Sequence, residues 1–117
     1  MKQKPKPLIR RVNKLKPFLA KDGALIYELL RPQNSGIKNM GLAMGELGKR
    51  KKAIPHYHKI SEEVYYVLYG NGEKTLDGNT KKIKAGDAFY IPIHSIHALI
   101  NSGDKNLKVL CVSSPPY

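Results

Sequence analysis

The sequence has only one cysteine, Cys111, so the chain cannot form an internal disulfide. Such cysteine usage is typical of a reducing compartment. The features of a signal peptide are also lacking, because the N-terminal residues are basic and proline-rich rather than apolar. We therefore expect a cytoplasmic protein, in which Cys111 is a small core residue of the apolar run 107–112.

Long apolar runs and helical periodicity are both absent. No segment approaches the roughly 18 consecutive apolar residues of a membrane helix, so we expect no membrane partner. Short apolar runs recur instead about every ten residues, separated by glycine, proline, asparagine and aspartate, which is typical of β-sandwiches and barrels. With 117 residues, the chain fits one small domain with a modest core, for which we expect a homodimer.

Acidic residues are scarce: 9 stand against 21 lysines and arginines, which gives a net charge of +12. Eight of the basic residues lie in the first 21 positions, and four more form the run 49–52. Separate basic groups of this kind are typical of a solvated surface, so we do not expect a nucleic acid partner. A basic surface would suit an anionic small molecule.

The basic and proline-rich composition of residues 1–16 predicts an N-terminal arm, in which Leu8, Ile9 and Val12 pair along a sheet edge. Residues 17–117 form the single remaining domain. Its predicted strands are 18–20, 24–30, 39–47, 64–68, 73–76, 80–83, 88–91, 97–100 and 107–112. Residues 70–72 are expected to form a tight turn. The composition of 39–47 also allows a helix, but its glycines favour a strand. The pattern predicts an all-β fold, a small antiparallel jelly roll.

All four histidines of the chain lie between positions 56 and 97. His56 and His58 project from the same face of a strand, where two imidazoles suit a transition metal. Either Glu62 or Glu63 can join them, but not both, because neighbouring strand residues point to opposite faces. A third imidazole, His97, starts another apolar run. The spacing therefore predicts a metal site, although an isolated His-x-His pair is more often a surface feature.

This stretch resembles the two motifs of the cupin superfamily. The first motif reads His56-Tyr57-His58, four residues, Glu63, six residues and Gly70. The second reads Gly86, five residues, Pro92-Ile93-His94, two residues, His97, three residues and Asn101. Fifteen residues separate Gly70 from Gly86, as in compact members of the family. The resemblance implies a double-stranded β-helix, or jelly-roll barrel, that holds its ligands inside.

Two positions depart from the family pattern. Arg50 stands where the first motif begins with glycine, which predicts a longer or differently shaped turn before His56. His94 stands at the inner glycine of the second motif, where the turn requires a positive φ that histidine tolerates. Two roles remain open for His94: an acid or base at the rim of the site, or a polar turn residue.

The resemblance implies that His56, His58, Glu63 and His97 are the metal ligands, and that Asn101 pins a turn. Three imidazoles and one carboxylate leave about two open positions on an octahedral ion. The set accepts manganese, iron, cobalt, nickel, copper or zinc, so the expected cofactor is one divalent transition metal. A bound metal could polarise a carbonyl, or activate dioxygen if it is iron.

The predicted catalytic residues are Tyr65 and His94. Tyr65 shares the face of Glu63 in a strand, and its hydroxyl could hold a substrate or transfer a proton. Tyr66 points the other way and is expected to fill the core. The run 62–72 resembles cupins described as sugar-phosphate-isomerase-like. We therefore predict a metal-dependent enzyme acting on a small sugar-like or keto-acid molecule by isomerisation or dioxygenation. The alternative is a binding or sensor module without turnover.

Overall fold

A computed structural model describes residues 8–116, and these form nine β-strands and two short 3₁₀ helices with no α-helix. The all-β prediction is therefore confirmed. The elements are η1 (Val12–Lys14), β1 (Phe18–Leu19), β2 (Leu25–Leu30), η2 (Pro32–Asn34), β3 (Gly41–Leu47), β4 (Glu62–Tyr69), β5 (Asn71–Leu76), β6 (Asn79–Lys84), β7 (Ala88–Ile91), β8 (His97–Ile100) and β9 (Leu107–Ser114).

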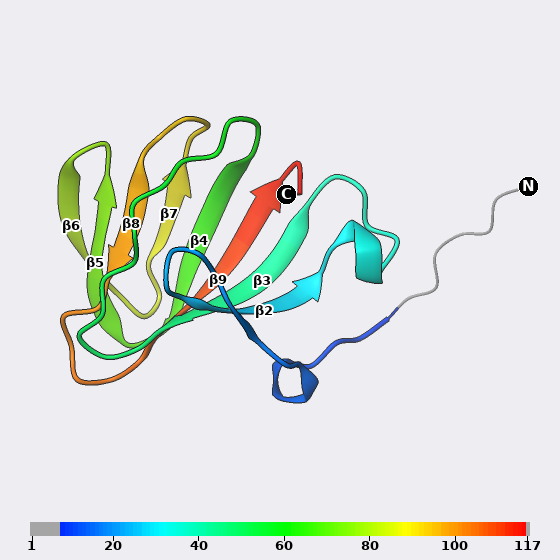
Figure 1. Ribbon diagram of the computed structural model, residues 1–117, viewed down its shortest axis with the longest axis horizontal. Helices are drawn as coiled ribbons and strands as arrows, with labels where there is room; N and C mark the ends of the chain where they lie inside the picture. Colours follow the sequence, from blue (N-terminus) through cyan, green and yellow to red (C-terminus); the bar gives the residue numbers. More distant parts are fainter. Residues whose placement is uncertain (1–7, 117) are drawn as a thin grey trace, which may run out of the picture.

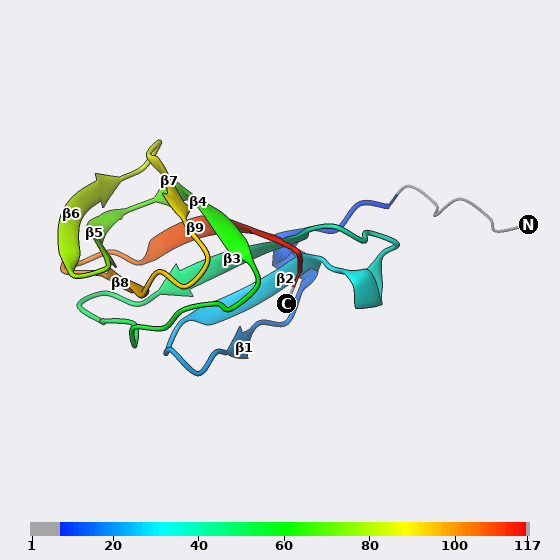
Figure 2. The ribbon, with the colours of Figure 1, turned by 90° about the horizontal axis from the view of Figure 1, so that it is seen from above.

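The strands build two antiparallel sheets (Figure 1). One has six strands in the order β1-β2-β3-β9-β4-β7, and the other has three in the order β6-β5-β8. Seen from above, the two sheets curve toward each other as the walls of an open barrel (Figure 2). The apolar core lies between them and is formed by Leu47, Ala53, Tyr65, Val67, Ile83, Ile91, Leu107 and Val109.

The side chains of strand β4 alternate between the inside of the barrel and the outer face. Glu63, Tyr65 and Val67 point into the barrel and are at most 9% exposed, whereas Val64 and Tyr66 are more than 40% exposed. This burial follows the two-residue period of a strand. The prediction that Glu63 and Tyr65 share one face of β4 and Tyr66 lies on the other is therefore confirmed. Tyr66 is not the core residue that we expected, because its position in the strand places it on the outer face.

The segment before β4 extends the three-stranded sheet without forming a regular strand. Isolated antiparallel bridges join Lys52 to Ile100 and His56 to His97. The amide of Ala53 also donates to the carbonyl of Leu99. This pairing carries the His-x-His motif along the edge of β8 and into the mouth of the barrel.

The N-terminal prediction needs a correction. Residues 8–11 form no strand, Val12 begins η1, and no sheet pairing involves these residues in the described part of the chain. Val12 and Leu15 instead line a shallow cleft with Tyr27 and Met44 on the outer face of β2 and β3. Apolar side chains of the arm cover a sheet face there rather than extend its edge. Predictions about residues 1–7 lie outside the described residues.

The turn predicted at 70–72 is shorter than expected. Gly70 alone lies between β4 and β5, and it has a φ of 85°. Gly72 belongs to β5, where a Cβ atom would lie 2.3 Å from the carbonyl oxygen of Ile100. The second glycine therefore permits a close approach of β5 to β8 and is not part of the turn.

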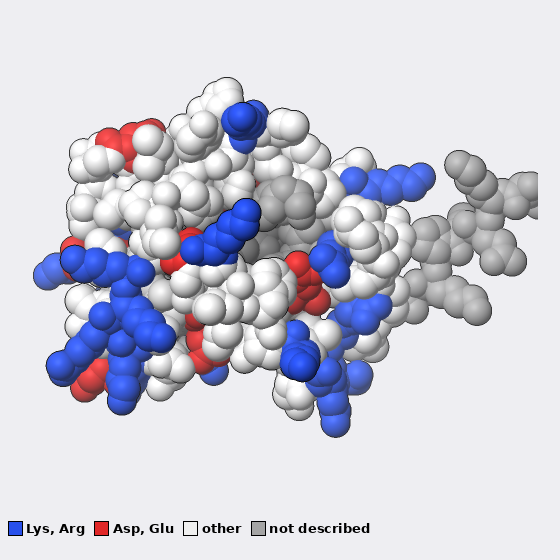
Figure 3. Space-filling view, in the orientation of Figure 1, with Lys and Arg blue, Asp and Glu red and all other residues white. Residues whose placement is uncertain are grey.

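Basic side chains gather at the lower left and at the lower right of the face shown in Figure 3. The basic run 49–52 is exposed and lies in the loop after β3. The charge is thus divided between separate groups, as the sequence indicated. No helix of the described residues is long and apolar enough to cross a membrane.

Asn101 ties together the loops at the far end of the barrel, as the predicted turn role requires. Its side-chain amide donates to the carbonyls of Leu47, Gly48 and Lys105 at 3.1, 3.1 and 2.7 Å, and its Oδ1 accepts from the amide of Gly103. Asn101 is 1% exposed, so water cannot replace these bonds. One side chain therefore joins the end of β3 to the connection between β8 and β9.

We predict that Asn101→Ala lowers the free energy of unfolding by at least about 2 kcal/mol, because buried carbonyls lose their donor. Urea denaturation followed by circular dichroism measures this loss. Asn106→Ala is the matched control. Asn106 is exposed and bonds through its side chain to Glu46, so its removal should cost less than about 1 kcal/mol. Equal losses in the two variants would contradict the role of Asn101.

Candidate metal centre

The two histidine motifs meet through their backbones. The amide of His56 donates to the carbonyl of His97 at 3.0 Å, and the amide of His97 donates back at 2.8 Å. The imidazole centroids of these two residues are 4.3 Å apart, and that of His58 lies 5.0 and 5.4 Å from them. Residues about forty positions apart in the sequence are thus held side by side by one β-bridge.

The carboxylate of Glu63 completes the cluster from the opposite sheet. Its Oε1 lies 2.9 Å from Nε2 of His58 and 3.4 Å from Nε2 of His97. The four potential ligand atoms of His56, His58, Glu63 and His97 all lie within 4.8 Å of one another. The predicted convergence of three imidazoles and one carboxylate is therefore present.

Backbone carbonyls orient two of the imidazoles. Nδ1 of His97 lies 2.9 Å from the carbonyl oxygen of Ser95, and Nδ1 of His56 lies 3.3 Å from that of Ile54. If each Nδ1 carries the proton, each Nε2 is left with a free lone pair. A backbone partner on the remote nitrogen is the usual device that fixes a metal-binding histidine.

The pKa values of His56 and His97 are shifted in opposite directions. Burial and the neighbouring His97 lower the pKa of His56, against weaker opposing effects of Ile54 and Asp22. Burial also acts to lower the pKa of His97, but its bonds with Glu63 and Ser95 outweigh this and raise it. The carboxylate therefore favours positive charge on His97.

The donor set fits a transition metal. Glu63 is 1% exposed at the bottom of the site, and a buried carboxylate needs a positively charged partner. Nitrogen and oxygen donors in this number suit divalent manganese, iron, cobalt, nickel or zinc. A divalent ion bound by the neighbouring imidazoles would supply that positive charge. His56, His58, Glu63 and His97 are thus grouped as a candidate metal site.

A cavity of about 520 Å³ opens beside the cluster, and we call it the outer cavity. His56, His58 and Tyr65 form its inner end. Much of the remaining wall is apolar, with Phe18, Ile26, Leu30, Leu42, Ala43, Ile54 and Pro116 among its residues. Four charged side chains also line it, namely Lys21, Asp22, Glu28 and Arg31. The volume is sufficient for a small organic molecule.

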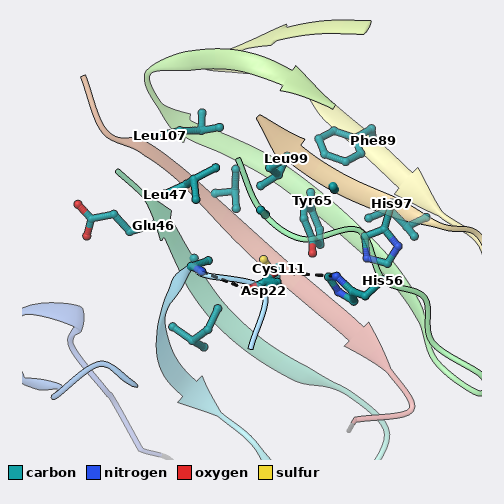
Figure 4. Close-up of a pocket in the computed structure, with 17 residues that line it drawn as sticks. Asp22, Glu46, Leu47, His56, Tyr65, Phe89, His97, Leu99, Leu107 and Cys111 are labelled. Carbon is teal, nitrogen blue, oxygen red and sulfur yellow. Dashed lines mark hydrogen bonds and ion pairs between the residues drawn. The ribbon is translucent and has the colours of Figure 1, made fainter. Parts of the chain in front are cut away.

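Tyr65 lies deep in the site. Its ring is 6.3 Å from that of His97, at an interplanar angle of 89°. The hydroxyl points toward Cys111, between the neighbouring histidines and β9 (Figure 4). Cys111 is only half-buried as a residue, but it packs against the core as predicted, and burial raises the pKa of its thiol. A neutral thiol is a poor nucleophile.

His94 occupies the turn that the family pattern assigns to glycine, with a φ of 68°. Its side chain is exposed, its ring lies 6.4 Å from that of Tyr57, and its amide donates to the carbonyl of His58. His94 does not line the outer cavity. Of its two predicted roles, the turn residue agrees with this geometry, and the acid-base role stays a prediction.

Asp22 is a functional candidate that the sequence analysis missed. It lies in the turn between β1 and β2, where its carbonyl accepts from the amide of Ile54 and its Oδ1 accepts from the amide of Ala24. Its Oδ2 is 3.9 Å from Nδ1 of His56. The turn itself was predicted, but no local signal shows that the hairpin packs over the ligand segment.

The fold and the site agree with comparisons to known proteins. A family model described as a cupin domain matches residues 43–113. An uncharacterized protein of Methanocaldococcus jannaschii is 43% identical over 106 residues, which cover 90% of this chain and 84% of that protein. Polyketide synthase CurC of Streptomyces cyaneus is 35% identical over 96% of this chain and 72% of its own length.

A solved structure shows the same fold at low sequence identity. The crystal structure of a predicted oxalate decarboxylase from Thermotoga maritima has a TM-score of 0.81, with coverage of 93% of this chain and 99% of that one. Its sequence identity is 23%. At that identity the likeness concerns the architecture of the chain and not its chemistry.

We predict that His58→Ala lowers the metal content of the purified protein at least about tenfold, because removal of a ligand costs no less than removal of a supporting residue. Elemental analysis after reconstitution measures the change. His94→Gly is the matched control, because it removes an imidazole outside the cluster and suits the positive φ. Stoichiometric metal in His58→Ala, or its loss in His94→Gly, would count against the site.

The neighbouring glutamates offer a second test. Glu63→Gln should sharply weaken metal binding, because it removes the buried carboxylate from the cluster. Glu62→Gln should leave binding almost unchanged, because Glu62 is exposed and accepts a hydrogen bond from the hydroxyl of Tyr90 at 2.8 Å. Competition with a chelating dye gives both dissociation constants. The reverse order would show that the register of β4 is wrong.

Proposed function

The chain belongs to the cupin family, and from this premise we propose that it is a metal-dependent enzyme acting on a small carbonyl compound with two neighbouring oxygen atoms. The observation that carries the proposal is the position of the candidate metal site beside a cavity of about 520 Å³, which two of its four ligands, His56 and His58, line directly. A pocket of this size beside a metal site is a reaction chamber rather than a closed structural site.

The lining of the cavity narrows the substrate class. Apolar side chains predominate beyond the cluster, so an apolar body attached to the carbonyl group fits better than a bare sugar. Arg31 is paired with Glu28, while Lys21 offers a further positive charge at the wall. The name of the relative CurC, a polyketide synthase, supports a substrate with several carbonyl groups and a carbon skeleton.

The chemistry starts with removal of a proton next to the carbonyl. When bound, a divalent metal would supply Lewis acidity that stabilises the resulting enolate. Tyr65 would hold the substrate oxygen or return the proton, and the apolar wall would exclude water. Asp22, whose carboxylate lines the same cavity, is in place to accept the proton. Isomerisation completes the reaction by reprotonation of the enolate at a different atom. Dioxygenation would instead place both atoms of dioxygen in the products, with cleavage of the O–O bond and of one carbon–carbon bond of the substrate.

A module that binds a small molecule without turnover is the second candidate. The observation that favours it is the exposed position of His94, which does not line the outer cavity. In this alternative the protein has the same metal site and cavity, but it does not catalyse exchange of substrate protons with solvent.

A homodimer remains a further prediction. Val64, Tyr66 and Leu68 on the outer face of β4 are each more than 40% exposed, and Tyr90 lies beside them on β7. A second copy of the chain would cover these apolar side chains. No nucleic acid is proposed, because the basic groups are separated on the surface.

The proposal is tested by deuterium exchange at the carbon next to the carbonyl, measured by proton NMR. We expect the metal-loaded protein to accelerate exchange in a panel of β-dicarbonyl compounds, keto acids and sugar phosphates. Tyr65→Phe should slow exchange at least about a hundredfold if the hydroxyl transfers a proton. Tyr66→Phe is the control and should change nothing, because Tyr66 lies on the outer face. Saturable binding without exchange would refute catalysis and favour the binding module.

A further inference from the structure

A second, smaller cavity lies inside the barrel behind the histidines, and we call it the inner chamber (Figure 4). Its volume is about 40 Å³. His56 and His97 lie at one end of the chamber, and Leu47 and Leu107 lie at the other. A single water molecule needs roughly 10–15 Å³ of such space, so the chamber can hold a guest of a few atoms.

The far end of the chamber is apolar. Leu47 and Leu107 lie there, and most of the other side chains around the chamber are also apolar. Glu46 is also a lining residue, but its carboxylate is turned away and accepts a hydrogen bond from Asn106. A stable buried water needs two to four polar partners, and an apolar void of this kind stays dry and takes up apolar atoms such as xenon.

The chamber adjoins the outer cavity at the metal cluster. Five residues line both spaces, namely Asp22, Ile26, His56, Tyr65 and Cys111. The side chain of Tyr65 is 9% exposed and stands where the two spaces meet. A guest in the inner chamber would therefore lie next to the cluster while a substrate occupies the adjoining outer cavity.

We propose that the inner chamber is a binding site for a small apolar gas molecule beside the metal ligands. Two small molecules without a dipole moment fit this description: dioxygen, which the proposed oxygenation would consume, and carbon dioxide, which a decarboxylation would release. The proposal adds to the proposed function, since a dioxygen site would select oxygenation over isomerisation. The binding site itself does not require a metal, so it can be tested on the metal-free protein.

Xenon is the probe, with binding followed in solution by ¹²⁹Xe NMR and by the methyl resonances of the protein. We expect saturable shifts of the methyl groups of Leu47, Leu107 and Val109. The methyl groups of Leu42, which line only the outer cavity, should not respond. No saturable shift, or a response of Leu42 alone, would overturn the proposal whether or not the protein is an enzyme.

Gly45 offers a matched pair of variants. A Cβ atom at Gly45 would lie 3.4 Å from Val109 Cγ2, 3.8 Å from Ile26 Cδ1 and 3.9 Å from Cys111 Sγ, which are ordinary contacts. Gly45→Ala should therefore fold and lower xenon affinity roughly tenfold, because a methyl group takes much of the available volume. Gly48→Ala, outside both cavities, should leave it unchanged. An unaltered xenon affinity in Gly45→Ala would show that the xenon site is not the inner chamber.

If Gly45→Ala does not fold, Val109→Ala provides a second test of where xenon binds. It enlarges the chamber and should raise xenon affinity, and an unchanged affinity would again contradict the location. Competition then identifies the gas. Displacement of xenon by dioxygen supports a store of co-substrate, and displacement by carbon dioxide alone supports a pocket for a released product. Displacement by neither gas would overturn the assignment.

Discussion

A buried carboxylate dictates the organisation of this barrel. Glu63 lies on the inner face of β4 and is almost inaccessible to solvent, where an isolated negative charge would cost far more than one hydrogen bond returns. The imidazoles of His58 and His97 meet that charge. The ligand segment before β4 pairs with β8, and this pairing brings His56 and His97 side by side.

The turns of the two motifs are retained even where their glycines are replaced. Arg50 and His94 have φ values of 58° and 68°, and Gly70 and Gly86 have values of 85° and 97°. All four positions thus adopt the left-handed region, which costs a residue other than glycine of order 1 kcal/mol or more. The longer or differently shaped turn that we predicted before His56 stays a prediction, because the φ of Arg50 alone does not describe the whole turn. The surrounding hydrogen bonds, including that from the amide of Arg50 to Gly103, hold it in place.

Local periodicity accounts for what the sequence predicted well. The parity of β4 separates Glu63 and Tyr65 from Glu62 and Tyr66, and the motif spacing predicted both the family and the convergence of the four candidate ligands. What the sequence did not predict concerns contacts between segments that are far apart in the chain. The packing of the arm over Met44 and the approach of Asp22 to His56 depend on how β2 docks, which no short window of sequence encodes. The expected burial of Tyr66 failed because an apolar residue on an outer face looks the same in sequence as one in the core.

The two cavities divide the barrel by polarity, and the division follows from the same alternation that places the ligands. Side chains of β4 that point inward are polar at its start, with Glu63, and apolar further along, with Val67. The mouth of the barrel can therefore hold an ion and a polar substrate group, whereas most side chains around the inner chamber are apolar. Tyr65 lies between them on the strand and has both characters, a hydroxyl toward the site and a ring that packs on Phe89. The inward-facing residues of one strand, Glu63, Tyr65 and Val67, thus lead in order from the candidate metal site to the apolar core.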